Sequence, residues 1–279
     1  MSRFARRVVL AAAGFSPVVT GLVKPTAANS GVPTGTSLTV INGDLTISTA
    51  GQIVSGKDVR GFVYITASNV TFQNSIVRGR SPSGNGALVN VNAGANITLN
   101  RLTIAPTTPS VYLDGIWGDN YTATGLDISG TVDGLKIGSN CTLEKSYVHD
   151  MTYYASDPNQ GGGPTHNDCV QMLSGDSVTL YGNCLNLGMN GGSAVQITQD
   201  YGAVTNVVIE HNWMDGGGCS LNIAHKVLSS LSGILVKDNV FGRNSGFNCP
   251  ILISTQTTII NTNNTYEDDG QIVPIQQHD

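Results

Sequence analysis

The chain contains few charged residues. Lys, Arg, Asp and Glu make up 12% of its 279 residues, about half of the usual ~25%. The formal net charge of −5 provides no basic footprint for a nucleic acid and argues against an electrostatic hold on an anionic membrane. We therefore expect no nucleic-acid partner.

Long apolar runs are also missing, except at the N-terminus. Three arginines precede the run VVLAAAGFSPVVTGLV, and small residues follow in PTAANSG. This order is typical of an export signal, and Pro17 inside the run argues against a membrane-spanning helix. We expect residues 1–30 to be an export signal or disordered N-terminus, residues 31–279 to form one domain, and the protein to be secreted, without membrane contact once the signal is removed.

A nine-residue pattern recurs along the chain, and its copies start 20 to 37 residues apart. The second and fourth places are mostly apolar, and several copies carry Asn at the seventh place. The copies are NVTFQNSIV (69–77), NITLNRLTI (96–104), NYTATGLDI (120–128), NCTLEKSYV (140–148), SVTLYGNCL (177–185), NVVIEHNWM (206–214), GILVKDNVF (233–241) and a degenerate copy from Thr257. Asn183, Asn212, Asn239 and Asn263 are expected to form a ladder along the stack.

A second short strand precedes most copies, for example DGLKI (133–137), DCVQM (168–172) and SAVQI (193–197). Period-two strands in units of 20–30 residues, with no helical stretch between them, predict a β-solenoid whose parallel coils stack about 4.8 Å apart. Leucine-rich repeats would need a leucine spacing that is absent, and a β-sandwich would not explain the register of the asparagines.

Over residues 40–265 this pattern resembles the pectate-lyase-like right-handed parallel β-helix proteins. The resemblance implies an all-β, single-stranded right-handed parallel β-helix of about nine coils. It implies an extracellular polysaccharide as partner. The chain would be a monomer or, if it is a tail-like protein, a trimer.

Asparagine and cysteine each leave two interpretations open. The five N-x-Thr triplets look like glycosylation acceptors, but four of them stand at the first repeat place, which favours a role at strand entry. None of the five cysteines has metal-ligand spacing. Cys219 and Cys249 occupy equivalent places on adjacent coils, so they form either a disulfide or stacked thiols.

Alignment of the short strands predicts a groove. The fourth residues form one outward column, and the second residues are predicted to form a small, outward trough beside it. The column is Trp117, Lys136, Gln171, Gln196 and Asn222; the trough is Gly115, Gly134, Cys169, Ala194 and Ser220. Amides and an aromatic ring beside a shallow trough suit a polysaccharide, although an ordinary solvated sheet face has a similar composition.

Asp114, Asp133 and Asp168 occupy one repeat position on three successive coils. Carboxylates about 4.8 Å apart repel one another. They must bind a cation, for which Ca²⁺ is a candidate, share protons, or be separated because each caps a backbone N–H at the turn into its strand.

The longest insertion is bracketed by His149-Asp150 and His166-Asn167-Asp168, with Tyr153 and Tyr154 inside it. We expect it to fold over the groove and carry catalytic histidines and substrate-binding tyrosines, because long solenoid loops usually mark the binding face. A purely stabilising loop is the alternative.

Three functions fit these residues. The resemblance to β-helix lyases implies β-elimination of a uronate polymer, with Lys136 as base and calcium held by the aspartates; His166 could be base or acid instead. Aspartates on adjacent coils, or on alternate coils such as Asp114 and Asp168, could instead hydrolyse a glycosidic bond, so Asp133 and Asp168 are also catalytic candidates. A non-catalytic adhesin or phage-tail-type protein is the third class. We rank the lyase slightly ahead.

Overall fold

The computed structural model describes residues 21–278, apart from residue 92, residues 189–190 and residues 227–230. The first 20 residues of the predicted export signal lie outside the described residues. Where the chain is described, no helix is long and apolar enough to cross a membrane.

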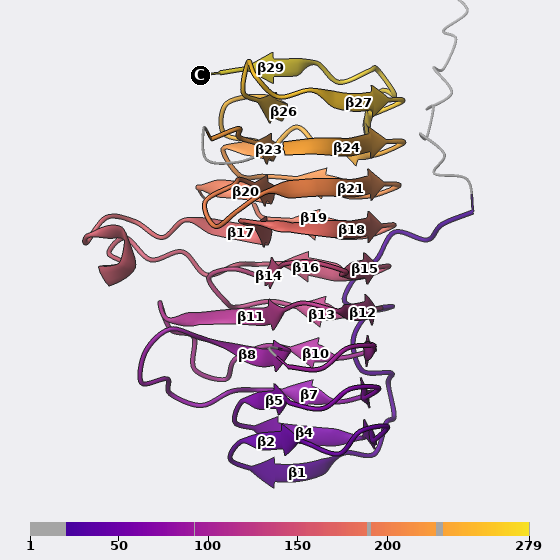
Figure 1. Cartoon of the computed structure of the whole chain (residues 1–279), viewed down its shortest axis with the longest axis vertical. Coiled ribbons are helices and arrows are strands. Elements are labelled where there is room, and N and C mark those ends of the chain that lie inside the picture. The colour runs from indigo at the N-terminus through magenta and orange to yellow at the C-terminus, as the bar shows by residue number, and fades with distance from the viewer. Residues whose placement is uncertain (1–20, 92, 189–190, 227–230, 279) are drawn as a thin grey trace, which may run out of the picture.

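The chain forms a right-handed parallel β-helix, as predicted, with one strand of each of three parallel sheets in most coils (Figure 1). The first sheet contains β1 (Thr39–Asn42), β4 (Lys57–Arg60), β7 (Ile76–Val77), β10 (Thr103–Ile104), β13 (Asp127–Ile128), β16 (Tyr147–His149), β19 (Cys184–Asn186), β22 (Trp213–Asp215), β25 (Val240–Phe241) and β28 (Thr265–Tyr266). The second sheet contains β2 (Leu45–Ile47), β5 (Val63–Ile65), β8 (Gly86–Val91), β11 (Leu113–Gly118), β14 (Leu135–Ile137), β17 (Asn167–Met172), β20 (Gly192–Ile197), β23 (Cys219–Ile223), β26 (Cys249–Ile253) and β29 (Ile275–Gln277). The third sheet contains β3 (Ile53–Ser55), β6 (Thr71–Gln73), β9 (Ile97–Asn100), β12 (Tyr121–Thr124), β15 (Thr142–Glu144), β18 (Gly175–Tyr181), β21 (Val204–Glu210), β24 (Leu231–Lys237) and β27 (Ile259–Thr262).

The core fills the inside of the coils. The apolar second and fourth places of the repeat point inward; Phe72, Leu99, Ile209 and Val236 are each 0% exposed. Their alternation with outward polar residues is the period-two pattern of a strand buried on one face. The only helix in the described part of the chain is η1 (Pro158–Gln160), a short 3-10 turn in the long insertion.

Asparagines at the first repeat place start the strands of the third sheet. All five asparagines of the N-x-Thr triplets, including Asn263 between β27 and β28, have a left-handed backbone, with φ between 54° and 61°, a conformation that Asn tolerates better than most residues. Asn96 Nδ2 donates to Asn69 Oδ1 at 2.9 Å, and Asn140 Nδ2 donates to Asn120 Oδ1 at 2.9 Å. This geometry explains their recurrence without glycosylation.

A buried ladder of asparagines connects the third and first sheets, and one predicted member is wrong. The Asn ladder consists of Asn183, Asn212, Asn239 and Asn264, each 0% exposed; Asn263 instead has a left-handed backbone. Ile259 pairs with Ile234, so the last copy of the repeat starts one residue later than predicted. Two adjacent asparagines concealed this shift in the sequence.

The second sheet carries a disulfide. Cys219 and Cys249 lie opposite one another on β23 and β26, with their sulfurs bonded and Cα atoms 4.6 Å apart. This selects the disulfide over stacked thiols. Cys141, Cys169 and Cys184 are free and buried.

The domain was expected to begin at residue 31. The described chain already contacts the β-helix before this residue, for example at Lys24. Residues 21–36 run along the outside of the coils (Figure 1). Lys24 forms an ion pair of 2.6 Å with Glu267, Arg101 donates to the Asn29 carbonyl, and the Gly31 amide donates to the Gly125 carbonyl. Residues 24–31 are therefore anchored to coils far apart in the stack.

Candidate functional site

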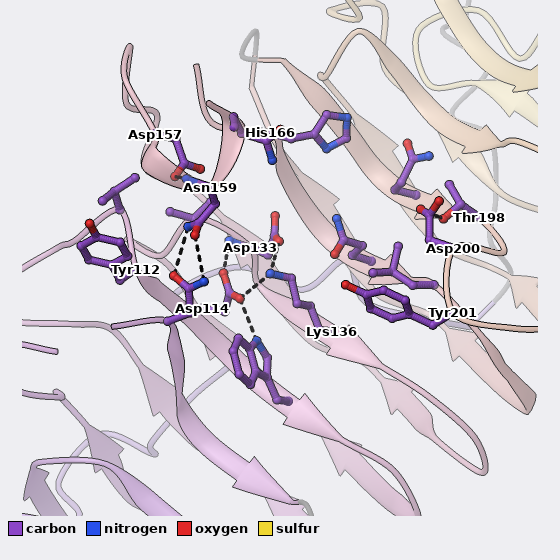
Figure 2. Close-up of a pocket in the computed structure, with 18 of the residues that line it drawn as sticks. Tyr112, Asp114, Asp133, Lys136, Asp157, Asn159, His166, Thr198, Asp200 and Tyr201 are labelled. Atoms are coloured by element: carbon purple, nitrogen blue, oxygen red, sulfur yellow. Dashed lines mark hydrogen bonds and ion pairs between the residues drawn. The ribbon is translucent and has the colours of Figure 1, made fainter. Parts of the chain in front are cut away.

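A groove of about 780 Å³ lies on the outer face of the second sheet (Figure 2). Strands β11, β14, β17 and β20 supply its floor. One wall consists of Asn85, Tyr112 and the insertion, and the opposite wall consists of Thr198, Asp200, Tyr201 and Lys226. The insertion therefore borders the groove, as expected.

The predicted outward column exists. The strand register pairs Trp117 with Lys136, Lys136 with Gln171, Gln171 with Gln196, and Gln196 with Asn222. The first four line the groove, whereas Asn222 continues the column beyond the groove-lining residues. The floor thus presents an indole, an ammonium and two amides to a ligand.

The predicted trough of small residues is wrong, because these residues face the core. Cys169, Ala194 and Ser220 are each 0% exposed, and a Cβ on Gly134 would come within 2.5 Å of the Val148 side chain. The β-ladder omits one residue in these strands: Asp114 pairs with Ala87 and Ile116 with Val89, with Gly115 left between them.

This break in the pairing, which skips one residue in each strand, changes which side chains share the groove face. Each aspartate at this repeat position and the residue three positions after it both point toward the groove. Trp117 Nε1 donates to Asp114 Oδ2 at 2.7 Å, and Gln171 Nε2 donates to Asp168 Oδ2 at 2.9 Å. The second column under the groove is therefore formed by the aspartates. We call Asp114, Asp133 and Asp168 the Asp ladder.

One oxygen of each ladder carboxylate caps the next coil. Asp114 Oδ1 accepts from the Asp133 amide at 3.1 Å, Asp133 Oδ1 from the Asp168 amide at 2.8 Å, and Asp168 Oδ1 from the Ser193 amide at 2.8 Å. This is the capping role left open by the sequence. It explains why an acidic residue recurs at this position.

The other oxygen of each carboxylate holds a side chain of the groove. Lys136 Nζ lies 2.6 Å from Asp114 Oδ2 and 3.1 Å from Asp133 Oδ2. His166 Nδ1 lies 3.2 Å from Asp168 Oδ2. Figure 2 shows Lys136 on the floor between the two walls, with His166 above it at the base of the insertion.

The charges within the ladder shift the pKa values of its members. Burial, together with the charges of Asp114 and Asp168, raises the pKa of Asp133 well above its usual range, despite the opposing Lys136 charge. Burial would lower the pKa of Lys136, but Asp133 and Asp114 outweigh it and raise that pKa. The hydrogen bond to Asp168 raises the pKa of His166 against the opposing effect of burial. A proton held within the ladder is thus consistent with its geometry.

The ladder does not fit the predicted calcium site. In the described part of the chain, no three His, Cys, Asp or Glu side chains are grouped closely enough to hold a metal. The Lys136 ammonium is itself the cation that contacts Asp114 and Asp133. We therefore assign no chemical step to calcium.

The insertion contributes one expected residue, His166, and three that were not expected. Asp157, Asn159, Gln160 and His166 line the groove, whereas Tyr153 and Tyr154 do not. Tyr154 belongs to the base of the insertion, where its amide and carbonyl bond to Thr165.

A pair of amides ties the tip of the insertion to an earlier coil. Asn159 and Asn85 exchange two side-chain hydrogen bonds of 2.9 and 3.0 Å. Because Asn85 directly precedes β8, the insertion reaches back across the coils of β14 and β11. This contact, the Asn85–Asn159 clasp, fixes one wall of the groove.

His149 does not belong to the groove. It ends β16 in the first sheet, where its ring stacks on Tyr147 at a centroid distance of 3.8 Å. Its nitrogens contact Asp127 at 3.0 Å and Asp150 at 2.7 Å. His149 thus lies on the first sheet, whereas His166 directly precedes β17 of the second sheet, and only His166 lines the groove.

The wall opposite the insertion was missed by sequence reasoning. Thr198, Asp200 and Tyr201 follow β20, and Lys226 follows β23. Thr198 Oγ1 donates to Asp200 Oδ2 at 2.6 Å, and Lys226 Nζ bonds to Asp200 Oδ1. These residues shortly follow two strands that pair with one another. That shared position in the repeat is the sequence signal that could have placed them together.

Comparison with known proteins identifies no family. No family model and no curated protein sequence matches the chain. Among solved structures, an alginate lyase from Paenibacillus sp. str. FPU-7 is similar, with 12% identity, a TM-score of 0.43, and coverage of 80% of this chain and 87% of that chain. Membership in the pectate-lyase-like group therefore stays a prediction.

Proposed function

We propose that the groove cleaves a uronate-containing polysaccharide by β-elimination. The observation that carries this proposal is which side chains reach the groove. His166 is 48% exposed and Lys136 36%, whereas the side chains of Asp114, Asp133 and Asp168 are 6%, 3% and 0% exposed. The reactive groups available to a substrate are thus an imidazole and an ammonium, each held from behind by buried carboxylates.

Lys136 acts as the cation and not as the base. Its ammonium contacts two carboxylates, which raise its pKa and keep it protonated. A fixed positive charge on the groove floor would bind the substrate carboxylate and stabilise the negative charge that develops when the neighbouring proton leaves. This differs from the role of base that the sequence suggested for Lys136.

His166 acts as the base. With Nδ1 held by Asp168, Nε2 is the nitrogen that can accept a proton. The imidazole removes the proton next to the substrate carboxylate, the C–H electron pair forms the new C=C bond, and the bond to the glycosidic oxygen breaks. The protonated imidazole then returns its proton to the leaving oxygen, so that no further reagent is consumed.

Hydrolysis is the second candidate, because one observation favours it. Asp133 has a raised pKa, and a protonated carboxyl is the acid that a glycoside hydrolase needs. However, the Asp133 side chain is only 3% exposed and Oδ2 already contacts Lys136. Hydrolysis would require the floor to rearrange, so we rank it second.

The test is a screen of uronate polymers with two parallel measurements, ultraviolet absorbance and new reducing ends. We expect absorbance to rise with the reducing ends, because elimination leaves a double bond conjugated with the carboxylate. His166→Ala and Lys136→Gln should each lower turnover at least about 100-fold. His211→Ala is the matched control, since His211 lies outside the groove-lining residues.

Each other result has a definite meaning. New reducing ends without the absorbance rise would establish hydrolysis. Full turnover by folded His166→Ala and Lys136→Gln variants would refute the assigned residues. Polymer binding without either product would indicate a non-catalytic binder.

A further inference from the structure

The wall opposite the insertion contains an exposed aromatic ring with no role in the proposed chemistry. Tyr201 is 81% exposed and lines the groove. Figure 2 shows its ring across the floor from Tyr112, with the hydroxyl turned toward the groove. Its backbone is fixed, because the Tyr201 amide donates to the Leu173 carbonyl at 3.0 Å.

Polar groups frame this ring. Next to Tyr201, the Asp200 carboxylate accepts from Thr198 Oγ1 and Lys226 Nζ. A flat aromatic face beside a paired carboxylate and ammonium combines the two features that bind a pyranose: a surface for its C–H face, and an acceptor and donors for its hydroxyls.

The position of this wall along the stack gives the distance to the reacting groups. Lys136 is on β14, Tyr201 follows β20 two coils further on, and Lys226 follows β23 after one more coil. At about 4.8 Å per coil, these positions lie roughly 10 and 14 Å from Lys136 along the stack. A pyranose unit is about as long as one coil is high, so the wall lies about two or three sugar units away.

We propose that Tyr201, Asp200 and Lys226 form a remote subsite for a sugar unit of the polymer. The ring of Tyr201 stacks on the pyranose, while Asp200 and Lys226 bind its hydroxyls. The proposal rests on the polysaccharide function above. Its consequence is a preference for long chains, because a short oligomer seated over Lys136 does not extend to Tyr201.

The test compares kcat/KM for a dimer, which ends about one sugar unit from Lys136, and for a long polymer of the same sugar. Tyr201→Ala should lower kcat/KM for the polymer about fivefold, mainly by raising KM, with a much smaller effect on the dimer. Tyr201→Phe, which keeps the ring, should restore most of the loss. Phe247→Ala is the matched control, because Phe247 is 77% exposed but does not line the groove.

Polymer binding is measured in parallel, without turnover, to separate this proposal from the proposed function. If the polymer binds but is not cleaved, the function fails, and weaker binding by Tyr201→Ala with rescue by Tyr201→Phe still supports the subsite. An equal loss for dimer and polymer, or no loss in either measurement, overturns the subsite. Failure of the wild-type protein to bind any polymer in the screen overturns both proposals.

Discussion

Two buried polar ladders run along the same stack, and they differ in how their hydrogen bonds close. In the Asn ladder, Asn212 Oδ1 accepts from the amide and the Nδ2 of Asn183, and Asn212 Nδ2 donates to Asn239 Oδ1 and to the carbonyls of Leu180 and Glu210. An amide side chain has both donors and acceptors, so this ladder is satisfied within itself. It does not need a groove.

The Asp ladder cannot close in this way, because a carboxylate only accepts hydrogen bonds. Oδ1 of each member caps the next coil, and Oδ2 needs donors from elsewhere. Lys136, Trp117, Gln171 and His166 supply those donors from the groove side. A carboxylate in place of an amide thus leaves Oδ2 without a partner inside the ladder. The groove side chains that bond to this oxygen are the ones that form the candidate site.

The largest effect on stability is expected when a charged side chain is placed in the Asn ladder. In Asn239→Asp, the carboxylate loses the two donors that now reach the Ile209 carbonyl and Asn264 Oδ1. We expect the free energy of unfolding to fall by about 4 kcal/mol at neutral pH. Burial should raise the pKa of the new carboxyl, so part of the loss should be recovered in acid. Urea unfolding at pH 7 and pH 4 measures both effects.

The reverse substitution is the control. Asp133→Asn keeps an oxygen to cap Asp168 and should cost only about 1 kcal/mol. Because the pKa of Asp133 is raised, the wild-type native state holds more protons than the unfolded state between about pH 4 and that raised pKa. The wild-type stability should therefore decrease as pH rises above about 4, and Asp133→Asn should lack this decrease. Equal losses for the two swaps would contradict the comparison.

An intermediate effect, on the pKa of His166 and the pH dependence of activity, is expected when the contact between Asp168 and His166 is changed. Asp168→Asn removes the charge that raises the pKa of His166, so that pKa should fall. Because the neutral imidazole is the proposed base, the acidic limb of activity should move to lower pH.

An NMR titration of the histidine C–H signals measures this shift directly, and five histidines are few enough to assign. The His149 signal is an internal control, because Asp127 and Asp150, which help raise its pKa, remain in place. An unchanged His166 titration would show that Asp168 does not tune the base.

The sequence was sufficient for the fold, the outward column and the common position of the three aspartates, because all of these follow from periodicity. It was insufficient where periodicity carries no signal. Gly115 and Gly134 fit either face of a strand, so the break in the strand pairing that turns the aspartates toward the groove was hidden. His149 lies on a short strand whose sheet could not be inferred. Tyr201 lies in the connection between β20 and β21. The strand repeat does not extend there, so it does not predict whether the side chain is buried or exposed.

The smallest effect is expected for the third amide contact, the Asn85–Asn159 clasp. Its two hydrogen bonds are as short as those of the Asn ladder, but both residues are exposed, so water replaces the lost partner. A double-mutant cycle of Asn85→Ala and Asn159→Ala should give a coupling below about 1 kcal/mol. Protease nicking of residues 150–166 is the local measurement, with Gln160→Ala as control. A coupling energy as large as the loss of stability in Asn239→Asp would show that burial does not explain the difference in strength between the clasp and the Asn ladder.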